Sequence, residues 1–511
     1  MPVDPRTPVI VGVGQFTERI DDADYRGMSA VDLATEAVRA ALADTGADPA
    51  AVARAIEVFA GLRQFEICTP FAKPPLGASD NYVRSVAQRV GADPAHAVLE
   101  PIGGNGPQKL MTEFAGKIAA GDHEVVLILG SEPGSTAKYF SDKSDKPDFT
   151  EHVGGQLEDR GYGFEQYMSE YTAKHGLTGA PVQYGLLDNA RRARLGLGVE
   201  EYRRRMAELF APFSRVAAKN PFSSSPVERS VVEIETVTGE NRMICDPYPR
   251  LLVARDTVNQ GAAALVMSVA AARRLGIAEE KWVYLRGHAN QTEQDLLDRV
   301  DPGVSYSAKN AVAEALRGAG VGIDDVSTFD LYSCFPFPVF AVCDEFGLAA
   351  DDPRGLTLTG GLPYFGGPGN SYSLHGIAET VAEMRDKPGS FGLVGANGGV
   401  MSKYSVGVYS TEAADWAPDR SQALQEDIAA LPKVAVTRDA DGPGTIETYS
   451  VRYDWPVTTG VIIGRLDADG SRFMALTEDD DLVALMTGGD PLGARITVTS
   501  SGDGTNLATL A

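Results

Sequence analysis

Residues 101–133 read PIGGNGPQKLMTEFAGKIAAGDHEVVLILGSEP, and this stretch decides the fold. It starts with the glycine-rich turn 103–106, and a helical pattern follows from Pro107, a residue well suited to the first turn of a helix. The apolar run 125–129 has the length of a buried strand, and Gly130 closes it. A turn, a helix and a buried strand in this order indicate an α/β architecture.

The same arrangement occurs a second time along the chain. Gly130 follows Asn105 by 25 residues, and Gly395 follows Asn370 by the same 25 residues and closes the apolar run 391–394. A second set of matches lies upstream, each pair 274 positions apart: 41–42 with 315–316, Gly46 with Gly320, and Val52 with Val326. Two independent sets in consistent order predict two similar α/β halves.

Several further segments lie in an order and at spacings that resemble the thiolase superfamily, in particular the sterol-carrier-type thiolases, over about residues 6–410. Besides residues 102–132, these segments are 213–221 (FSRVAAKNP), 256–268 (DTVNQGAAALVMS), 330–335 (DLYSCF), 366–368 (GGP) and 393–399 (LVGANGG). The resemblance implies a duplicated thiolase fold, with two βαβαβ-type halves in α/β/α/β/α layers and an inserted helical loop region. It also implies acyltransferase chemistry of the acetyl-CoA acetyltransferase kind, in lipid metabolism.

The catalytic positions that the resemblance implies carry none of the expected groups. Thiolysis needs a nucleophilic cysteine, a histidine that activates it, a second cysteine that moves a proton, and donors for the enolate oxygen. The equivalent positions here are Gly103 for the nucleophile, Gly367 for the histidine, Gly395 for the second cysteine and Tyr332 for the oxyanion-hole residue. Because loss of a covalent nucleophile costs on the order of 10⁶ in turnover, we expect ordinary thiolase activity to be absent.

Five side chains near these positions are candidates for the pocket: Asn105, Tyr332, Cys334, His375 and Asn397. Tyr332 could donate to an enolate oxygen or, with a lowered pKa, act as a base, and His375 could take over the work of the missing histidine. Each also has a structural interpretation. Asn105 would cap its helix, Asn397 would serve the backbone of its turn, and the other three would pack in the core or in a helix.

A local basic run offers contacts for the phosphates of CoA. Arg191, Arg192 and Arg194 lie in the predicted helical insertion 139–242, and guanidinium groups bind phosphate well. The alternative is a solvated helix face. We expect CoA or acyl-CoA as the ligand, no covalently bound cofactor and no metal.

Composition narrows the possible partners. The 511 residues carry a formal net charge of −24, which repels nucleic acid and anionic lipid. The 4 cysteines lack CxxC spacing, which argues against a disulfide framework or a zinc site. No leader pattern and no apolar run of about 20 residues is evident, so we expect a cytoplasmic protein. Oligomeric state stays open.

The pattern changes after about residue 410. Residues 1–412 are expected to form the thiolase-like core, with halves of about 1–270 and 271–412, and 413–432 to form a linker. Short alternating runs then predict a small all-β, OB-like closed barrel over 433–511. The candidate strands are 447–453, 460–466, 472–476, 482–486, 495–499 and 506–510. The barrel is a possible surface for a protein partner.

Three functions are compatible with these residues. The first is binding of acyl-CoA or a related thioester without thiolysis or Claisen condensation. The second is an acyl-CoA-dependent carbon–carbon lyase of the aldolase kind, in which Tyr332 or His375 would stabilise an enolate or move a proton. The third is an acyltransferase in which Cys334 has become the nucleophile. The first function is the leading hypothesis.

Overall fold

The structure is a computed structural model that describes residues 3–163, 169–455 and 457–511. Its first sheet contains parallel strands β3, β2 and β4, and continues with antiparallel strands β8 and β1. In spatial order the strands are β1 (Pro8–Glu18), β8 (Asn259–Ser268), β4 (Val125–Pro133), β2 (Val58–Leu62), β3 (His96–Glu100) and β5 (Glu158–Asp159).

The second sheet repeats most of this pattern. Its strands, in spatial order, are β10 (Val326–Leu331), β11 (Phe391–Gly398), β12 (Lys403–Ser410) and β9 (Tyr284–Thr292). Strands β10 and β11 are parallel, whereas β12 is antiparallel to both β11 and β9. The series β2, β4, β8 and β1 of the first sheet has the same directions in the same order. The predicted duplication is therefore confirmed.

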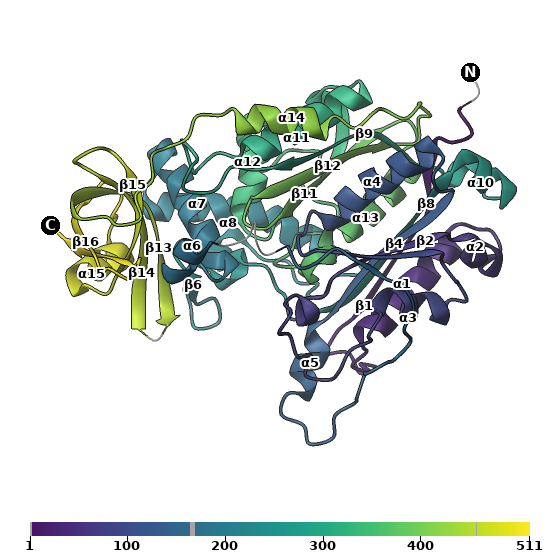
Figure 1. Cartoon of the computed structure of the whole chain (residues 1–511), viewed down its shortest axis with the longest axis horizontal. Coiled ribbons are helices and arrows are strands. Elements are labelled where there is room, and N and C mark those ends of the chain that lie inside the picture. Colours follow the sequence, from purple (N-terminus) through teal and green to yellow (C-terminus); the bar gives the residue numbers. More distant parts are fainter. Residues whose placement is uncertain (1–2, 164–168, 456) are drawn as a thin grey trace.

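Two helices that follow the glycine-rich turns lie between the sheets, as Figure 1 shows: α4 (Gly106–Ala120) and α13 (Tyr372–Asp386). Their apolar residues share one buried cluster with inward-facing residues of both sheets. Helices α1 (Ala30–Asp44), α2 (Pro49–Ala55) and α3 (Tyr82–Arg89) cover the outer face of the first sheet, and α11 (Tyr306–Ala319) covers that of the second. The layers are thus α/β/α/β/α, as predicted.

A largely helical region is inserted between β4 and β8, and it carries a small hairpin of strands β6 and β7. Its elements are α5 (Gly134–Phe140), α6 (Glu170–Lys174), α7 (Ala180–Leu195), α8 (Val199–Ala217), α9 (Val231–Glu235), β6 (Met243–Cys245) and β7 (Tyr248–Pro249). After β8 come α10 (Val269–Arg274) and, in the second half, α12 (Pro336–Phe346). Helix α12 packs against α7 and α8, so the insertion is joined to the second half of the core.

The predicted linker 413–432 contains helix α14 (Ser421–Ala429), which packs on strand β9. The Asn290 N–H donates to Ser421 Oγ at 2.8 Å, and the Thr292 N–H donates to Gln425 Oε1 at 2.8 Å. Because β9 is the last strand of its sheet, these side chains satisfy backbone groups that would otherwise stay unpaired. The segment is therefore a structural cover as well as a connection.

The C-terminal region is a closed barrel, in the order β14, β15, β17, β16 and β13, with β13 pairing back to β14. Its elements are β13 (Gly442–Trp455), β14 (Val457–Leu466), β15 (Arg472–Thr477), α15 (Asp480–Gly488), β16 (Arg495–Ser500) and β17 (Asn506–Leu510). The strand predicted over 482–486 is wrong because these residues belong to α15. Asp479 begins that helix by accepting the Leu482 N–H at 3.0 Å, and the barrel consequently has five strands.

The barrel packs on helix α7 of the insertion (Figure 1). Thr448 Oγ1 donates to the Leu186 carbonyl at 2.6 Å, and Asn189 Nδ2 donates to the Tyr449 carbonyl at 2.9 Å. Both contacts are buried, so the barrel is firmly attached to the core. Within the described ranges, no helix is long and apolar enough to cross a membrane.

Candidate functional site

A cavity of about 390 Å³ lies in front of the glycine-rich turn that precedes α4. Its wall includes Gly103 and Gly104 of this turn, together with three of the predicted pocket residues, Tyr332, Cys334 and Asn397. Tyr332 and Cys334 follow β10, whereas Asn397 lies at the end of β11. The two halves of the core therefore supply one cavity jointly, as the duplication leads one to expect.

The glycine-rich turns of the two halves are hydrogen-bonded to each other. The Gly103 N–H donates to Asn370 Oδ1 at 2.8 Å, and Asn370 Nδ2 donates to the Arg63 carbonyl at 2.6 Å. Ser373 Oγ, in the first turn of α13, donates to the Gly104 carbonyl at 2.6 Å. All these groups are buried, so the turn at Gly103 is held in one position.

The turn leaves little space for a side chain at either of its first two glycines. Gly103 has a φ of +149°, which L-residues rarely adopt, and a Cβ atom there would lie 2.6 Å from Asn105 Oδ1. A Cβ atom on Gly104 would lie 2.6 Å or less from ring atoms of Tyr332. The place that the resemblance assigns to the nucleophile is thus closed by neighbouring side chains.

Asn105 does not cap α4 with its side chain, so that expectation is wrong. Its backbone is helical, with φ −79° and ψ −13°, whereas a capping residue is usually extended. The amide Nδ2 instead donates to Ser405 Oγ on β12 at 3.2 Å. Asn105 therefore joins the first turn to the second sheet.

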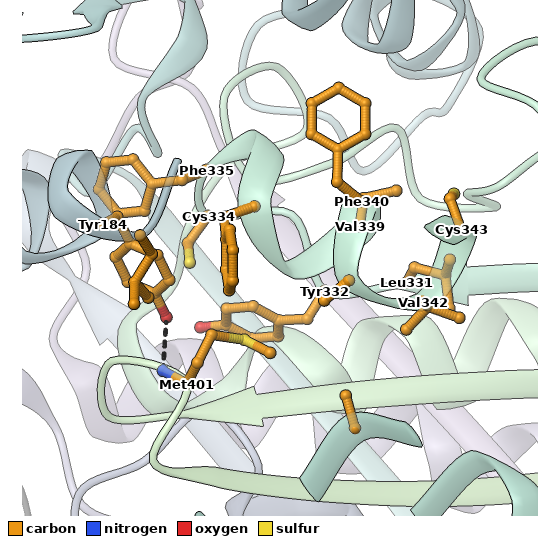
Figure 2. Packing of buried hydrophobic residues seen from close by; sticks show 14 of the residues in the cluster. Tyr184, Leu331, Tyr332, Cys334, Phe335, Val339, Phe340, Val342, Cys343 and Met401 are labelled. Carbon is orange, nitrogen blue, oxygen red and sulfur yellow. Dashed lines mark hydrogen bonds between the residues drawn. The ribbon is translucent and has the colours of Figure 1, made fainter. Parts of the chain in front are cut away.

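The cavity wall contains two tyrosines, Tyr184 and Tyr332. The Tyr184 hydroxyl is hydrogen-bonded, whereas the Tyr332 hydroxyl has no hydrogen bond to any described residue. The Tyr332 ring packs edge-on against Tyr372, with 5.3 Å between ring centroids. Figure 2 shows its hydroxyl end directed toward the side of the site where Tyr184, Cys334 and Met401 lie. Burial raises the pKa of the Tyr332 phenol well above its ordinary value, so the hydroxyl stays protonated: it can donate a hydrogen bond but cannot act as a base.

Cys334 and Asn397 are connected through Tyr184, a residue of α7. Asn397 Nδ2 donates to Tyr184 Oη at 2.5 Å and lies 3.8 Å from Cys334 Sγ, while Asn397 Oδ1 has no partner among the described residues. Tyr184 Oη in turn donates to the Gly399 carbonyl at 3.2 Å. Burial raises the pKa of the Cys334 thiol to about 12, which disfavours a nucleophilic thiolate.

Of the remaining predicted positions, Gly367 lines the cavity, whereas Gly395 and His375 do not. A Cβ atom on Gly395 would lie 2.5 Å from Oη of the buried Tyr404. His375 is fully buried elsewhere on α13, with Nδ1 2.7 Å from Gln15 Oε1. Burial lowers the pKa of His375 to about 3, so its imidazole is neutral and does not reach the cavity.

The three arginines predicted to contact CoA are paired within the chain. Arg191 Nη2 lies 2.6 Å from Asp344, and Arg194 Nη2 lies 2.9 Å from the same carboxylate. Arg192 Nη1 lies 2.7 Å from Asp490 of the barrel. Their contact with CoA stays a prediction that this geometry does not favour. In the part of the chain that the structure describes, no group of His, Cys, Asp and Glu side chains is arranged to hold a metal ion.

Several residues of the cavity wall were not predicted: Phe65, Cys68, Tyr184, Asp256, Asn370 and Lys403. Asn370 was recognised only as the start of a helix, although its amide holds the Gly103 turn. Tyr184 lies in helix α7, and the basic run at residues 191–194 of this helix does not include it. Only the tertiary contacts of the insertion bring it to the site.

Comparison with known proteins gives the family. A family model of the additional C-terminal domain of thiolase-like protein type 1 matches residues 423–503. The crystal structure of a monomeric SCP2-thiolase like protein type 1 from Mycobacterium smegmatis is 63% identical, covers 100% of each chain and has a TM-score of 0.87. The chain belongs to the SCP2-thiolase-like proteins. The predicted membership of the thiolase superfamily is confirmed.

More distant structures share the fold of this SCP2-thiolase-like protein. An Ltp2–ChsH2(DUF35) aldolase is 19% identical over 80% of this chain and 98% of its own, with a TM-score of 0.57. Human mitochondrial 3-ketoacyl-CoA thiolase is 15% identical over 80% of this chain and 100% of its own, with a TM-score of 0.55. No protein with a curated description matches the chain.

Proposed function

We propose that this SCP2-thiolase-like protein binds an acyl-CoA or a related thioester in the 390 Å³ cavity and does not perform thiolysis. The proposal rests on one observation, namely that the Gly103 turn lines the cavity but leaves no space for a side chain. The turn faces an open cavity, yet Asn105 Oδ1 lies 2.6 Å from where a side chain on Gly103 would start. A ligand can approach this turn, but the turn has no group that could accept an acyl chain.

The composition of the cavity wall supports a ligand of this class. Apolar side chains make up much of the wall, among them Phe65, Ile102, Pro181, Phe335 and Leu362. They would surround an acyl chain, while a few polar groups would orient the carbonyl, as is usual for small-molecule sites. Human mitochondrial 3-ketoacyl-CoA thiolase, 14% identical, has been solved in complex with CoA. That complex makes CoA a reasonable first ligand to test.

A second candidate is a carbon–carbon lyase, and the hydroxyl of Tyr332 favours it. An aldol cleavage next to a thioester leaves an enolate, and a buried donor without a protein partner could stabilise the enolate oxygen. Binding and cleavage would use the same cavity, so the lyase is an extension of the first proposal. An acyltransferase that uses Cys334 is less well supported, because burial raises the pKa of this thiol to about 12.

Calorimetric titration with CoA and with acetoacetyl-CoA tests the proposal. Ala180→Trp would fill the cavity from the first turn of α7, and Ala423→Trp, on the exposed side of α14, is the matched control. We expect saturable binding that the first variant weakens at least tenfold and the second leaves unchanged. Absence of heat with the unmodified protein, or equal binding by both variants, would contradict the proposal.

A further inference from the structure

A tight turn in the wall of the 390 Å³ cavity has an unusual backbone. Residues 399–402 connect β11 to β12, and Gly399 and Ser402 line the cavity. Met401 has a φ of +47°, a left-handed conformation that glycine adopts readily but other residues adopt at a cost. Val400 and Ser402 also line a second cavity, of about 380 Å³, so the turn has open space on both sides. Packing alone does not fix this turn, and its hydrogen bonds become important.

A buried arginine holds the turn from the side of the second cavity. Arg299 is 1% exposed, and it donates from Nη2 to the Met401 carbonyl at 2.9 Å and from Nε to the Gln294 carbonyl at 3.0 Å. Burial lowers the pKa of Arg299, and the carboxylates of Glu293 and Asp295 oppose this shift, so the guanidinium stays charged. Arg299 thus connects the turn to the segment that follows β9.

The barrel in turn holds this segment through a second buried arginine. Arg472 of β15 is 0% exposed, and its Nη1 donates to the Leu297 carbonyl at 2.8 Å and to the Arg299 carbonyl. Glu447 of β13 fixes the Arg472 guanidinium, since it accepts from Nε at 2.8 Å and from Nη2 at 2.6 Å. Two hydrogen-bonded steps therefore lead from the barrel to the turn, first from Arg472 to Arg299 and then from Arg299 to Met401.

A second connection from the barrel ends at the same residue of the turn. Tyr184 Oη accepts the Met401 N–H at 3.3 Å, as Figure 2 shows. Two positions further along α7, the Leu186 carbonyl accepts from Thr448 Oγ1 of β13 at 2.6 Å. The carbonyl of Met401 is therefore held through Arg299 and its N–H through Tyr184, and the barrel supports both.

We propose that the C-terminal barrel is a positioning element of the candidate site, which fixes the turn 399–402 of the cavity wall through Arg472 and Arg299. Energetic coupling between distant groups is carried by chains of packed side chains and hydrogen bonds, and the two connections form such chains. Support of this kind holds the groups of a binding site at fixed positions. The inference goes beyond the proposed function, and only its consequence for ligand affinity rests on that function.

Hydrogen–deuterium exchange of residues 399–402 in the full chain tests the inference without any ligand. The deciding variant is Arg472→Gln. Its matched control is Arg465→Gln, because Arg465 also pairs with Glu447, at 2.9 Å, and donates to the Gly470 carbonyl at 3.3 Å within the barrel. Either variant leaves Glu447 with one arginine, but only Arg472→Gln removes donors from the segment after β9.

We expect the amides of the turn to exchange about tenfold faster in Arg472→Gln than in the unmodified protein, under conditions where urea unfolding shows both to be folded. Arg465→Gln should leave this exchange unchanged. Arg472→Lys should restore part of the protection, because an ammonium group can still donate to the two carbonyls. Equal exchange of the turn in Arg472→Gln and Arg465→Gln would overturn the inference.

Thr448→Val provides a milder change in case Arg472→Gln does not fold. It removes the hydrogen bond to α7, whereas its control, Thr477→Val, removes one that the Asp479 N–H donates within the barrel at 3.2 Å. Thr448→Val should speed exchange of the turn, and Thr477→Val should not. Equal exchange in these two variants would likewise count against the inference.

Calorimetric titration with CoA measures the consequence for the site. The dissociation constant for CoA should rise about fivefold in Arg472→Gln and stay unchanged in Arg465→Gln. Absence of CoA binding by the unmodified protein would contradict the proposed function alone, since the exchange experiment needs no ligand. Unchanged CoA affinity in an Arg472→Gln protein whose turn has loosened would overturn the positioning role.

Discussion

The hydroxyl of Tyr332 occupies the space in which a Cβ atom on Gly104 would lie. At Gly103, the residue before Gly104, Asn105 Oδ1 fills the space that a Cβ atom would need. These two side chains come from different halves of the core. Together they fill the space that a nucleophilic side chain would need, and neither of them can attack a thioester. The site is therefore repacked around its glycines, which distinguishes it from a site with one missing side chain.

Restoring a cysteine at the turn should not restore thiolysis. Gly103→Cys forces a side chain onto a φ of +149° and against Asn105, so we expect a loss of about 2–4 kcal/mol in the free energy of unfolding. Gly46→Ala is the control, because Gly46 also has a positive φ, +71°, but has open space around it. That variant should lose only about 1 kcal/mol in urea unfolding. Thiolysis of acetoacetyl-CoA by Gly103→Cys at normal enzyme rates would contradict this account.

Two tyrosines of the cavity should respond differently to loss of the hydroxyl. Tyr332→Phe removes a group without a protein partner, so the free energy of unfolding should change by less than about 0.5 kcal/mol. Tyr184→Phe removes the oxygen that accepts from Asn397 at 2.5 Å, which should cost about 1–3 kcal/mol. If the protein is a lyase, only Tyr332→Phe should abolish cleavage while binding persists. Equal destabilisation by both changes would show that Tyr332 has a structural role.

Asp330, at the end of β10 before the site, should make stability depend on pH. Burial raises the pKa of its carboxyl from 3.8 to about 6, although four hydrogen bonds to Oδ1 oppose this shift. The unfolded chain releases this proton first, so the contribution of Asp330 to stability falls as pH rises through about 4 to 6. Asp330→Asn keeps the acceptor and lacks the charge. The difference in free energy of unfolding between the variant and the unmodified protein should shift by about 2 kcal/mol in favour of the variant as pH rises from 4.5 to 6.5.

Urea unfolding at several pH values measures this difference. Asp93→Asn is the matched control, because Asp93 is fully exposed and 4.0 Å from its nearest cationic partner. The free energy of unfolding of Asp93→Asn should differ from that of the unmodified protein by the same amount at every pH. A parallel course for Asp330→Asn as well would mean that Asp330 is ionised in the folded state even at pH 4.5.

The short strand β5 should protect the edge of the first sheet. Arg160, next to β5, donates to Glu100 at 3.0 Å, to Glu113 at 2.8 Å and to Glu158 at 2.7 Å. Arg160→Gln should therefore cost about 1–3 kcal/mol and loosen β5 from β3, whose edge could then pair with another chain. Light scattering should detect association that Arg39→Gln, which removes an exposed i,i+3 pair, does not cause. A monodisperse Arg160→Gln protein of unchanged stability would contradict this prediction.

The fold could be predicted because its signals are local and occur twice. Glycine-rich turns, helix starts and buried apolar runs each depend on neighbouring residues, and the repeated spacing linked them into two halves. Ser29 and Asp32, which form a capping box at the start of α1, are a local signal of this kind. The run 482–486 was misjudged because a short apolar run can suit a strand or a helix, and the cap at Asp479 decides in favour of α15.

The site could be predicted only where its residues lie in segments that resemble the thiolase superfamily. Tyr332, Cys334 and Asn397 do line one cavity, but whether they bind a ligand stays a prediction. Tyr184 reaches them from a helix that lies about 150 residues before Tyr332 and Cys334 and 213 residues before Asn397, and no local pattern predicts such a contact. Likewise, the basic run at Arg191 is neutralised by Asp344, 153 positions away. Long-range pairing of this kind depends on the folded arrangement.

One calorimetric titration tests the central claim most directly, namely acetoacetyl-CoA added to the unmodified protein in the presence of free CoA. Binding without thiolysis predicts discrete heats that saturate, followed by a return to baseline. Thiolysis would instead produce sustained power that scales with substrate concentration. Either that sustained signal, or no heat at any ligand concentration, would contradict the account.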